Sequence, residues 1–263
     1  RMSMKYDLYI ERNTAIHRLD PRVKLIGAAL GMIAAVVVSD LLVLASIYAI
    51  VLVVIKLGQV TWERFKFATR TILPVSIMIV CLWPLFYRTG TPVLFSWGPI
   101  IITLPSLLTG ISAALRINVM AFCAFSLLYT TPQGSLVRGL VKLGLPYEYG
   151  LSLAIALRYI PTFGGIILMI MDAQKARGLE LDKGSFLRKT LKYVYVMAPV
   201  VITALRMADQ LSLAIESRAF GAPVKRTYVT DLRMRVVDTI AIAVVVVAFT
   251  GLVLARLLYG FGA

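Results

Sequence analysis

Two arginines flanked by small residues are the side chains in this chain whose type and spacing best suit a chemical task, the gripping of a partner. Residues 173–178 read Ala-Gln-Lys-Ala-Arg-Gly, and residues 214–219, 41 positions later, read Ala-Ile-Glu-Ser-Arg-Ala. Both copies stand where a long apolar stretch gives way to polar chain. A guanidinium stays charged and has five donors, so it binds carboxylates and backbone carbonyls well. The repeat therefore predicts two prongs for two similar sockets on a soluble partner.

A plainer interpretation exists for each copy by itself. The end of a helix exposes unpaired carbonyls and a partial negative charge, which stabilise an arginine by about 0.3–1 kcal/mol. One copy would be explained this way, but two copies with the same small neighbours favour docking. Gly178 and Gly221 are expected to let the chain leave each helix in a left-handed turn.

The elements that position these arginines follow from composition. The chain has 263 residues, is 59% hydrophobic and has a mean hydropathy of +0.84. Several runs of 16 or more residues carry almost no charge, which is typical of helices that cross a bilayer. The sequence predicts an all-α polytopic membrane protein with about five transmembrane helices and long amphipathic cytoplasmic helices.

Three regions are expected along the chain. They are an N-terminal set of four transmembrane helices at 1–129, a cytoplasmic module at 130–235 that holds both arginine motifs, and a last transmembrane helix at 236–263. The predicted spans are 23–39, 41–56, 72–87, 107–129 and 236–258, with a helix opened by Asp20-Pro21. Residues 88–106 are expected to form an external loop or a short re-entrant piece.

The placement of 130–235 depends on charge. Residues 150–171 and 193–208 are apolar enough to be spans, but if both crossed, the basic loop 172–192 would lie outside the cell. This conflicts with the positive-inside rule, and Pro161 and Pro199 also interrupt the two runs. We therefore expect helices at the cytoplasmic face and a cytoplasmic N-terminus. Of the 28 Lys and Arg residues, all except Arg88, Arg116 and Arg256 then lie inside, and Arg116 should face the bundle or snorkel.

Composition and motifs also exclude several classes of function. A net charge of +15 would suggest nucleic acid for a soluble protein, but here it reflects cytoplasmic loops, and we expect no nucleic acid as a partner. One histidine and two cysteines without metal-ligand spacing indicate no metal site. There is no Walker A sequence for ATP and no nucleophile–base arrangement, so the chain is expected to be non-catalytic and to hold no cofactor.

The motifs resemble a known family. Arg-Tyr-Ile-Pro at 158–161, Asp-Ala-Gln-Lys-Ala-Arg-Gly at 172–178 and Glu-Ser-Arg-Ala-Phe-Gly at 216–221 are similar to the transmembrane T component of energy-coupling factor (ECF) transporters, which includes the nickel and cobalt relatives. The opening His-Arg-Leu-Asp-Pro-Arg-Val-Lys-Leu at 17–25 also resembles the family. The likeness runs over nearly the whole chain. Ala219 in the second motif is a departure within the family's tolerance.

The resemblance implies a non-catalytic subunit of an ATP-driven importer in the prokaryotic cell membrane. Its partners would be two ABC-type ATPases, which bind the ATP and Mg, and a substrate-binding membrane S component that selects a vitamin or a transition-metal ion. The residues that would dock the ATPases at the ends of coupling helices are Ala176, Arg177, Gly178, Ser217, Arg218 and Ala219. The supporting residues are Arg158, Pro161, Asp172, Glu216 and Gly221.

The apolar sides of helices near 147–171 and 193–216 would offer the S component a greasy contact, although ordinary packing between the two helices would explain them too. Two other functions stay open. One is a membrane scaffold whose basic cytoplasmic surface binds anionic lipid or acidic partners, which high salt would weaken broadly. The other is an independent secondary transporter, which would work alone in liposomes.

Overall fold

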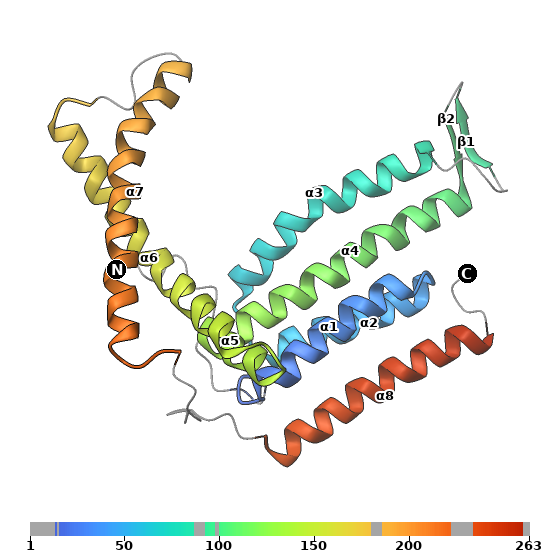
Figure 1. Ribbon diagram of the computed structural model, residues 1–263. Coiled ribbons are helices and arrows are strands. Elements are labelled where there is room, and N and C mark those ends of the chain that lie inside the picture. The colour runs from blue at the N-terminus through green and yellow to red at the C-terminus, as the bar shows by residue number, and fades with distance from the viewer. Residues whose placement is uncertain are drawn as a thin grey trace. The chain divides into compact units, whose positions relative to one another are not determined.

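The computed structural model describes Thr14 and residues 16–86, 93–97, 100–179, 186–221 and 234–259. These residues form eight helices and one two-stranded antiparallel hairpin (Figure 1). The helices are α1 Pro21–Val37, α2 Leu41–Leu57, α3 Trp62–Phe86, α4 Leu104–Thr130, α5 Gln133–Lys142, α6 Tyr147–Ala176, α7 Phe186–Glu216 and α8 Val236–Tyr259, and the strands are β1 Val93–Trp97 and β2 Ile100–Thr103. The predicted all-α fold class is confirmed.

The chain divides into two compact units. The bundle unit comprises Asp7–Leu151 and Leu232–Ala263, and the helix-pair unit comprises Ser152–Asp231. Most of α6 and the whole of α7 belong to the helix-pair unit, whereas α5 and the first residues of α6 belong to the bundle unit. Both arginine motifs thus lie in one unit.

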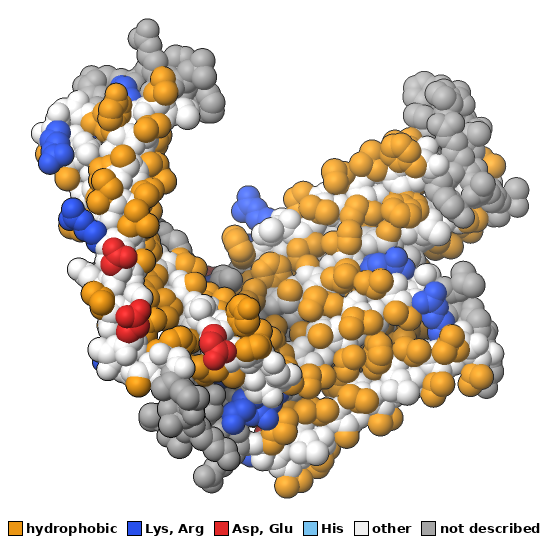
Figure 2. Space-filling model, viewed as in Figure 1, with side chains coloured by type: hydrophobic (Ala, Val, Ile, Leu, Met, Phe, Trp, Pro, Cys, Tyr) orange, Lys and Arg blue, Asp and Glu red, His pale blue; other side chains and the backbone are white. Residues whose placement is uncertain are grey.

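In the bundle unit, α4 packs against α1, α2 and α3, and α8 packs against α1. Leu44, Val119 and Cys123 are buried together in the core between α1, α2 and α4. The close approach of α1 and α4 depends on a missing side chain, because an added methyl group at Gly31 would lie 3.0 Å from Sγ of Cys123. Hydrophobic side chains cover most of the visible helix surface outside this core (Figure 2).

Carboxylate caps begin the first two helices. The Asp20 side chain accepts a hydrogen bond from the backbone nitrogen of Arg22 at 2.9 Å, and Asp40 accepts one from Leu42 at 2.9 Å. These bonds satisfy backbone donors that have no partner within the helix. The expected helix start at Asp20-Pro21 is therefore confirmed.

Five helices are long and apolar enough to cross a membrane, namely α3, α4, α6, the Thr190–Glu216 part of α7, and α8. The number agrees with the expectation, but the members differ. α1 and α2 have 17 residues each, about 25 Å of helix, which is slightly short of a hydrocarbon core of about 30 Å. The cytoplasmic placement of α6 and α7 stays a prediction.

The structure adds local detail to these expectations. Pro161 and Pro199, which interrupt the apolar runs of the sequence, lie inside long helices, since α6 runs unbroken for 30 residues and α7 for 31. A proline removes one hydrogen bond, and the turns on either side hold the helix together. α3 begins at Trp62, ten residues before the predicted span, because the Thr61 carbonyl accepts from the first turn of the helix. The segment expected as a loop or re-entrant piece contains the β1–β2 hairpin.

Candidate docking site

The first arginine turn, residues 174–179, ends α6 in a Schellman motif. The backbone nitrogen of Leu179 donates to the Gln174 carbonyl at 3.0 Å, and that of Gly178 donates to the Lys175 carbonyl at 2.9 Å. Gly178 has φ +87°, the left-handed conformation that this motif requires. Arg177 is therefore the last residue before the chain reverses.

The second arginine turn, residues 215–220, repeats this hydrogen bonding at the end of α7. The backbone nitrogen of Phe220 donates to the Ile215 carbonyl at 3.1 Å, and that of Ala219 donates to the Glu216 carbonyl at 2.9 Å. Ala219 has φ +55° and so occupies the left-handed position that glycine holds in the first turn. Arg218 is in the same place as Arg177, one residue before the reversal.

Both arginines are exposed and available for a partner. Arg177 and Arg218 are exposed, as are the small residues Ala176, Gly178 and Ala219 beside them. Within the described part of the chain, the structure gives neither guanidinium an ion pair or a hydrogen bond. Ser217, the remaining small neighbour, donates its hydroxyl to the Ala214 carbonyl at 3.0 Å and so turns back onto the helix. Nothing among these neighbours blocks access to the two charges.

The two turns lie at separate ends of crossing helices. Val196 and Val200 of α7 are buried against Ile170 and Met171 of α6, which marks the crossing (Figure 1). At a rise of 1.5 Å per residue, the end of α6 is about 10 Å from this crossing and the end of α7 is about 25 Å from it on the opposite side. The two guanidiniums are thus too far apart to share one groove, and they suit two separate sockets.

Three of the five supporting residues lie at the turns. Asp172 pairs with Lys175 at 3.9 Å, one helical turn before the first arginine. Glu216 accepts a hydrogen bond from the Ser212 hydroxyl at 3.1 Å, and Gly221 has φ +90° just after the second turn. The expected left-handed exit is therefore confirmed at Gly178, whereas in the second copy the reversal begins at Ala219, before Gly221.

The other two supporting residues lie elsewhere on α6. Arg158 and Pro161 precede Arg177 by 19 and 16 residues, about 25 Å or more along the helix. Arg158 is exposed, and its carbonyl accepts from the Thr162 hydroxyl at 3.4 Å. The structure does not bring these two residues to either docking turn.

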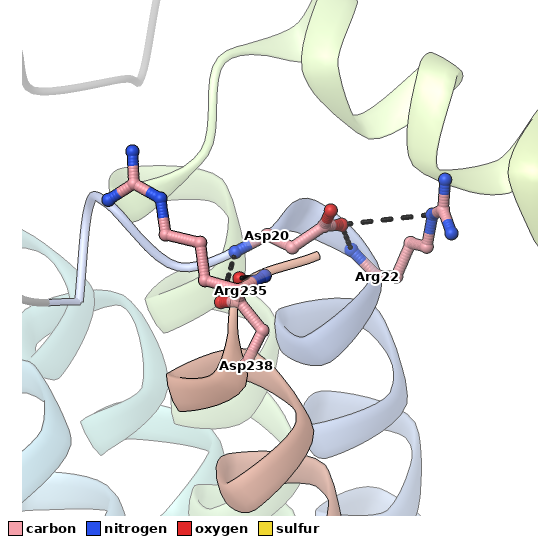
Figure 3. A network of polar contacts seen from close by, with 4 residues as sticks. All are labelled: Asp20, Arg22, Arg235 and Asp238. Atoms are coloured by element: carbon pink, nitrogen blue, oxygen red, sulfur yellow. Dashed lines mark hydrogen bonds and ion pairs between the residues drawn. The ribbon is translucent and has the colours of Figure 1, made fainter. Parts of the chain in front are cut away.

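A buried carboxylate that the sequence reasoning missed joins the starts of α1 and α8 (Figure 3). Asp238 is 3% exposed, and its Oδ1 accepts from the Asp20 backbone nitrogen at 2.9 Å. Its Oδ2 accepts from the backbone nitrogen of Arg235 at 2.8 Å, the residue just before α8. An acid in the third position of a helix is the signal that predicts such a cap.

This contact fixes the relative direction of the first and last helices. Because Asp238 and Asp20 both stand at helix starts, α1 and α8 run parallel, side by side (Figure 1). Nε of Arg22 forms an ion pair with Oδ1 of Asp20 at 3.8 Å, whereas the Arg235 side chain extends to the opposite side, away from both carboxylates (Figure 3). The predicted topology also has the first and last spans crossing in the same direction.

Comparison with known proteins gives the family. A family model described as cobalt transport protein (CbiQ) matches residues 12–229. The chain is 33% identical over 251 residues to an energy-coupling factor transporter transmembrane protein EcfT from Streptococcus equi, covering 91% of each chain. It is 32% identical to a protein of the same description from Leuconostoc gelidum, covering 90% of this chain and 91% of the other.

A different kind of relative comes from Bifidobacterium longum. That protein is described as a putative ABC transporter ATP-binding protein, is 31% identical over 92% of this chain, and is matched over 32% of its own length. The chain is a multi-pass membrane protein that belongs to the CbiQ family, as the non-catalytic transmembrane component of an energy-coupling factor transporter.

Proposed function

We propose that this chain links two cytoplasmic ABC-type ATPases to a substrate-binding S component, for uptake of a vitamin or a transition-metal ion. Arg177 docks one ATPase and Arg218 docks the other. The observation that carries the proposal is the identical hydrogen bonding of the two arginine turns, each with an exposed guanidinium at the end of a long helix. Two arginine turns of the same geometry suit two similar binding grooves, one on each ATPase.

The turn geometry supports docking on physical grounds. A Schellman turn fixes the backbone of the arginine, so less freedom is lost when its side chain binds. The guanidinium can then donate to carboxylates or carbonyls of a groove, and breaking a desolvated contact of this kind costs about 2–5 kcal/mol. Because α6 and α7 are unbroken helices, a movement of the docked arginine turn at one end of a helix is transmitted to its other end.

The relatives support an ATPase as the partner. The Bifidobacterium longum protein carries a stretch similar to this chain within a polypeptide described as ATP-binding. A transmembrane component and an ATP-binding protein joined in one chain are held at high effective concentration, which is useful when the two act together. The same association, between separate chains, is what the arginine turns would provide here.

The surface of the helix-pair unit supports an S component as the third partner. Large apolar side chains are exposed along both α6 and α7, outside the buried cluster where the two helices cross. They include Ile160, Leu168, Met169, Val194, Met197, Ile202, Leu205 and Leu213. Aliphatic and methionine side chains give an adaptable contact that lets a partner slide. Cargo selection would rest with that partner.

The test is uptake and complex assembly in the double variant Arg177→Glu/Arg218→Glu. We expect uptake to be lost and both ATPases to be absent when the membrane component is purified, because reversed charges repel the sockets. Arg206→Glu is the matched control, since Arg206 is exposed on α7 away from both turns. Normal ATPase binding in the double variant would overturn the docking role.

A further inference from the structure

Two arginines from different helices meet at the end of α1 in the bundle unit. Arg116, in the middle of α4, donates from Nη2 to the Val38 carbonyl at 2.9 Å and to the Ser39 hydroxyl at 3.3 Å. Arg256, near the end of α8, donates from Nη1 to the carbonyl of Val37. The two accepting carbonyls belong to consecutive residues, so both guanidiniums lie at the same end of α1.

The charge of this arginine pair is not balanced by the protein around it. Among the described residues, neither arginine forms an ion pair with a carboxylate, and the buried Nε of Arg116 has no hydrogen-bond partner. The carbonyls that end α1 supply only about half a negative charge. Asp40, the nearest acid in the sequence, caps α2 through the Leu42 nitrogen and forms no ion pair with either arginine among the described residues. Even with its negative charge counted beside the partial charge of the helix end, the two guanidiniums keep a net positive charge.

The position of the pair along α1 places it near one boundary of the membrane. α1 begins beside Asp238 at the end of the bundle where α8 also begins, and it ends 17 residues later, about 25 Å away. A hydrocarbon core is about 30 Å thick. With its start at one membrane boundary, the end of α1 comes within about 5 Å of the opposite boundary, and long arginine side chains at that point can reach the lipid headgroups. Half-buried guanidiniums at this depth need an anion nearby.

We propose that Arg116 and Arg256 together bind the phosphate group of an anionic phospholipid in that leaflet. Each guanidinium has five donors and spends only one or two on the protein, so several remain for phosphate oxygens. A phosphate between them removes the repulsion of the like charges and ties α1, α4 and α8 to one lipid. The site is independent of the arginine turns and does not involve ATPase docking.

The experiment compares the lipid retained by the purified full-length chain after detergent washing. Native mass spectrometry follows phosphatidylglycerol, phosphatidylcholine and inorganic phosphate in separate titrations. We expect one tightly held phosphatidylglycerol per chain, and a roughly tenfold loss of its affinity in Arg116→Gln/Arg256→Gln. Arg138→Gln is the control, because Arg138 is exposed on α5 in the same unit.

The outcomes separate the sources of phosphate. Binding of inorganic phosphate without retention of the lipid would overturn the lipid assignment, and equal lipid retention in the double glutamine variant would overturn the site. If that variant does not fold, Arg116→Lys/Arg256→Lys keeps the charges but loses the planar forks, and it should bind the lipid measurably more weakly. Unchanged affinity there would also refute the proposal, whereas ATPase docking should be normal in every variant.

Discussion

The two arginine turns share every backbone hydrogen bond that defines them and differ in the residue that reverses the chain. The first uses Gly178 at φ +87° and the second uses Ala219 at φ +55°. A left-handed residue with a Cβ costs about 1 kcal/mol or more, so the second turn is held against its own preference. The two helix ends therefore share the position of the arginine, although the left-handed conformation is easy for Gly178 and costly for Ala219.

The residue after each reversal shows what offsets this cost. Leu179 is half-buried and packs with the Val196 and Val200 cluster at the helix crossing. Phe220 occupies the same position in the second turn and is also half-buried. A hydrophobic residue at this position commonly accompanies a Schellman motif. The comparison teaches that an apolar anchor and two hydrogen bonds can define the turn without glycine.

The largest effect should come from reversing one charge at a time. Arg177→Glu and Arg218→Glu are each expected to remove one ATPase and leave the other, because each arginine has its own socket. The loss of about 2–5 kcal/mol at one interface is enough to empty that socket. Native mass spectrometry of the purified complex counts the ATPases that remain. Loss of both ATPases from either single variant would contradict the assignment of an independent socket to each arginine.

A smaller effect should follow from removing the glycine of the first turn. Gly178→Ala places a Cβ at φ +87° and should cost about 1 kcal/mol, as Ala219 does in the second turn. Hydrogen exchange at the Leu179 amide reports this, because its bond to Gln174 closes the turn. Exchange should be about fivefold faster in the variant. An unchanged rate would contradict the assigned strain.

The opposite substitution should have the opposite sign. Ala219→Gly relieves the strained residue, and we expect the Phe220 amide to exchange a few-fold more slowly, with a gain below about 1 kcal/mol because glycine also loosens the unfolded chain. The matched measurement is the Leu179 amide in the same sample, which should not change. If Phe220 exchanged faster, the alanine would be the preferred residue and the comparison would fail.

The smallest effect concerns the acid beside the first turn. Asp172 and Lys175 form an exposed ion pair at 3.9 Å. Exposed ion pairs contribute little to stability. Asp172→Asn should therefore change the free energy of unfolding, followed by thermal unfolding, by no more than about 0.5 kcal/mol. Uptake should stay near the level of the unchanged chain. A large loss of uptake with normal stability would instead place Asp172 in contact with an ATPase.

Much of the candidate site could be predicted because its signal is local. An arginine between small residues at the end of an apolar run predicts an exposed helix end. Both arginine turns do lie at exposed helix ends. The left-handed exit at Gly178 was predicted for the same reason. Alanine at a positive φ was not, because its propensity points the other way and only the surrounding turn imposes it.

The contacts that depend on distant parts of the chain could not be predicted. Arg116 was expected to face the bundle or to snorkel, and its guanidinium bonds to the end of α1, but the presence of Arg256 at the same helix end depends on the placement of three helices. Pro161 and Pro199 interrupt apolar runs in the sequence, yet both lie inside unbroken helices, because the turns on either side hold the helix together. Likewise, no local sequence signal predicts that Asp238 pairs with Asp20, because the two residues are far apart in the chain.

The bond between Asp238 and Asp20 joins residues 218 positions apart. During biosynthesis at about 5–20 residues per second, the first helix emerges about 10–40 s before its partner exists. In that interval the backbone nitrogen of Asp20 has only water, lipid or the insertion machinery as an acceptor. The nascent bundle therefore stays open along one side of α1 until α8 arrives and packs against it.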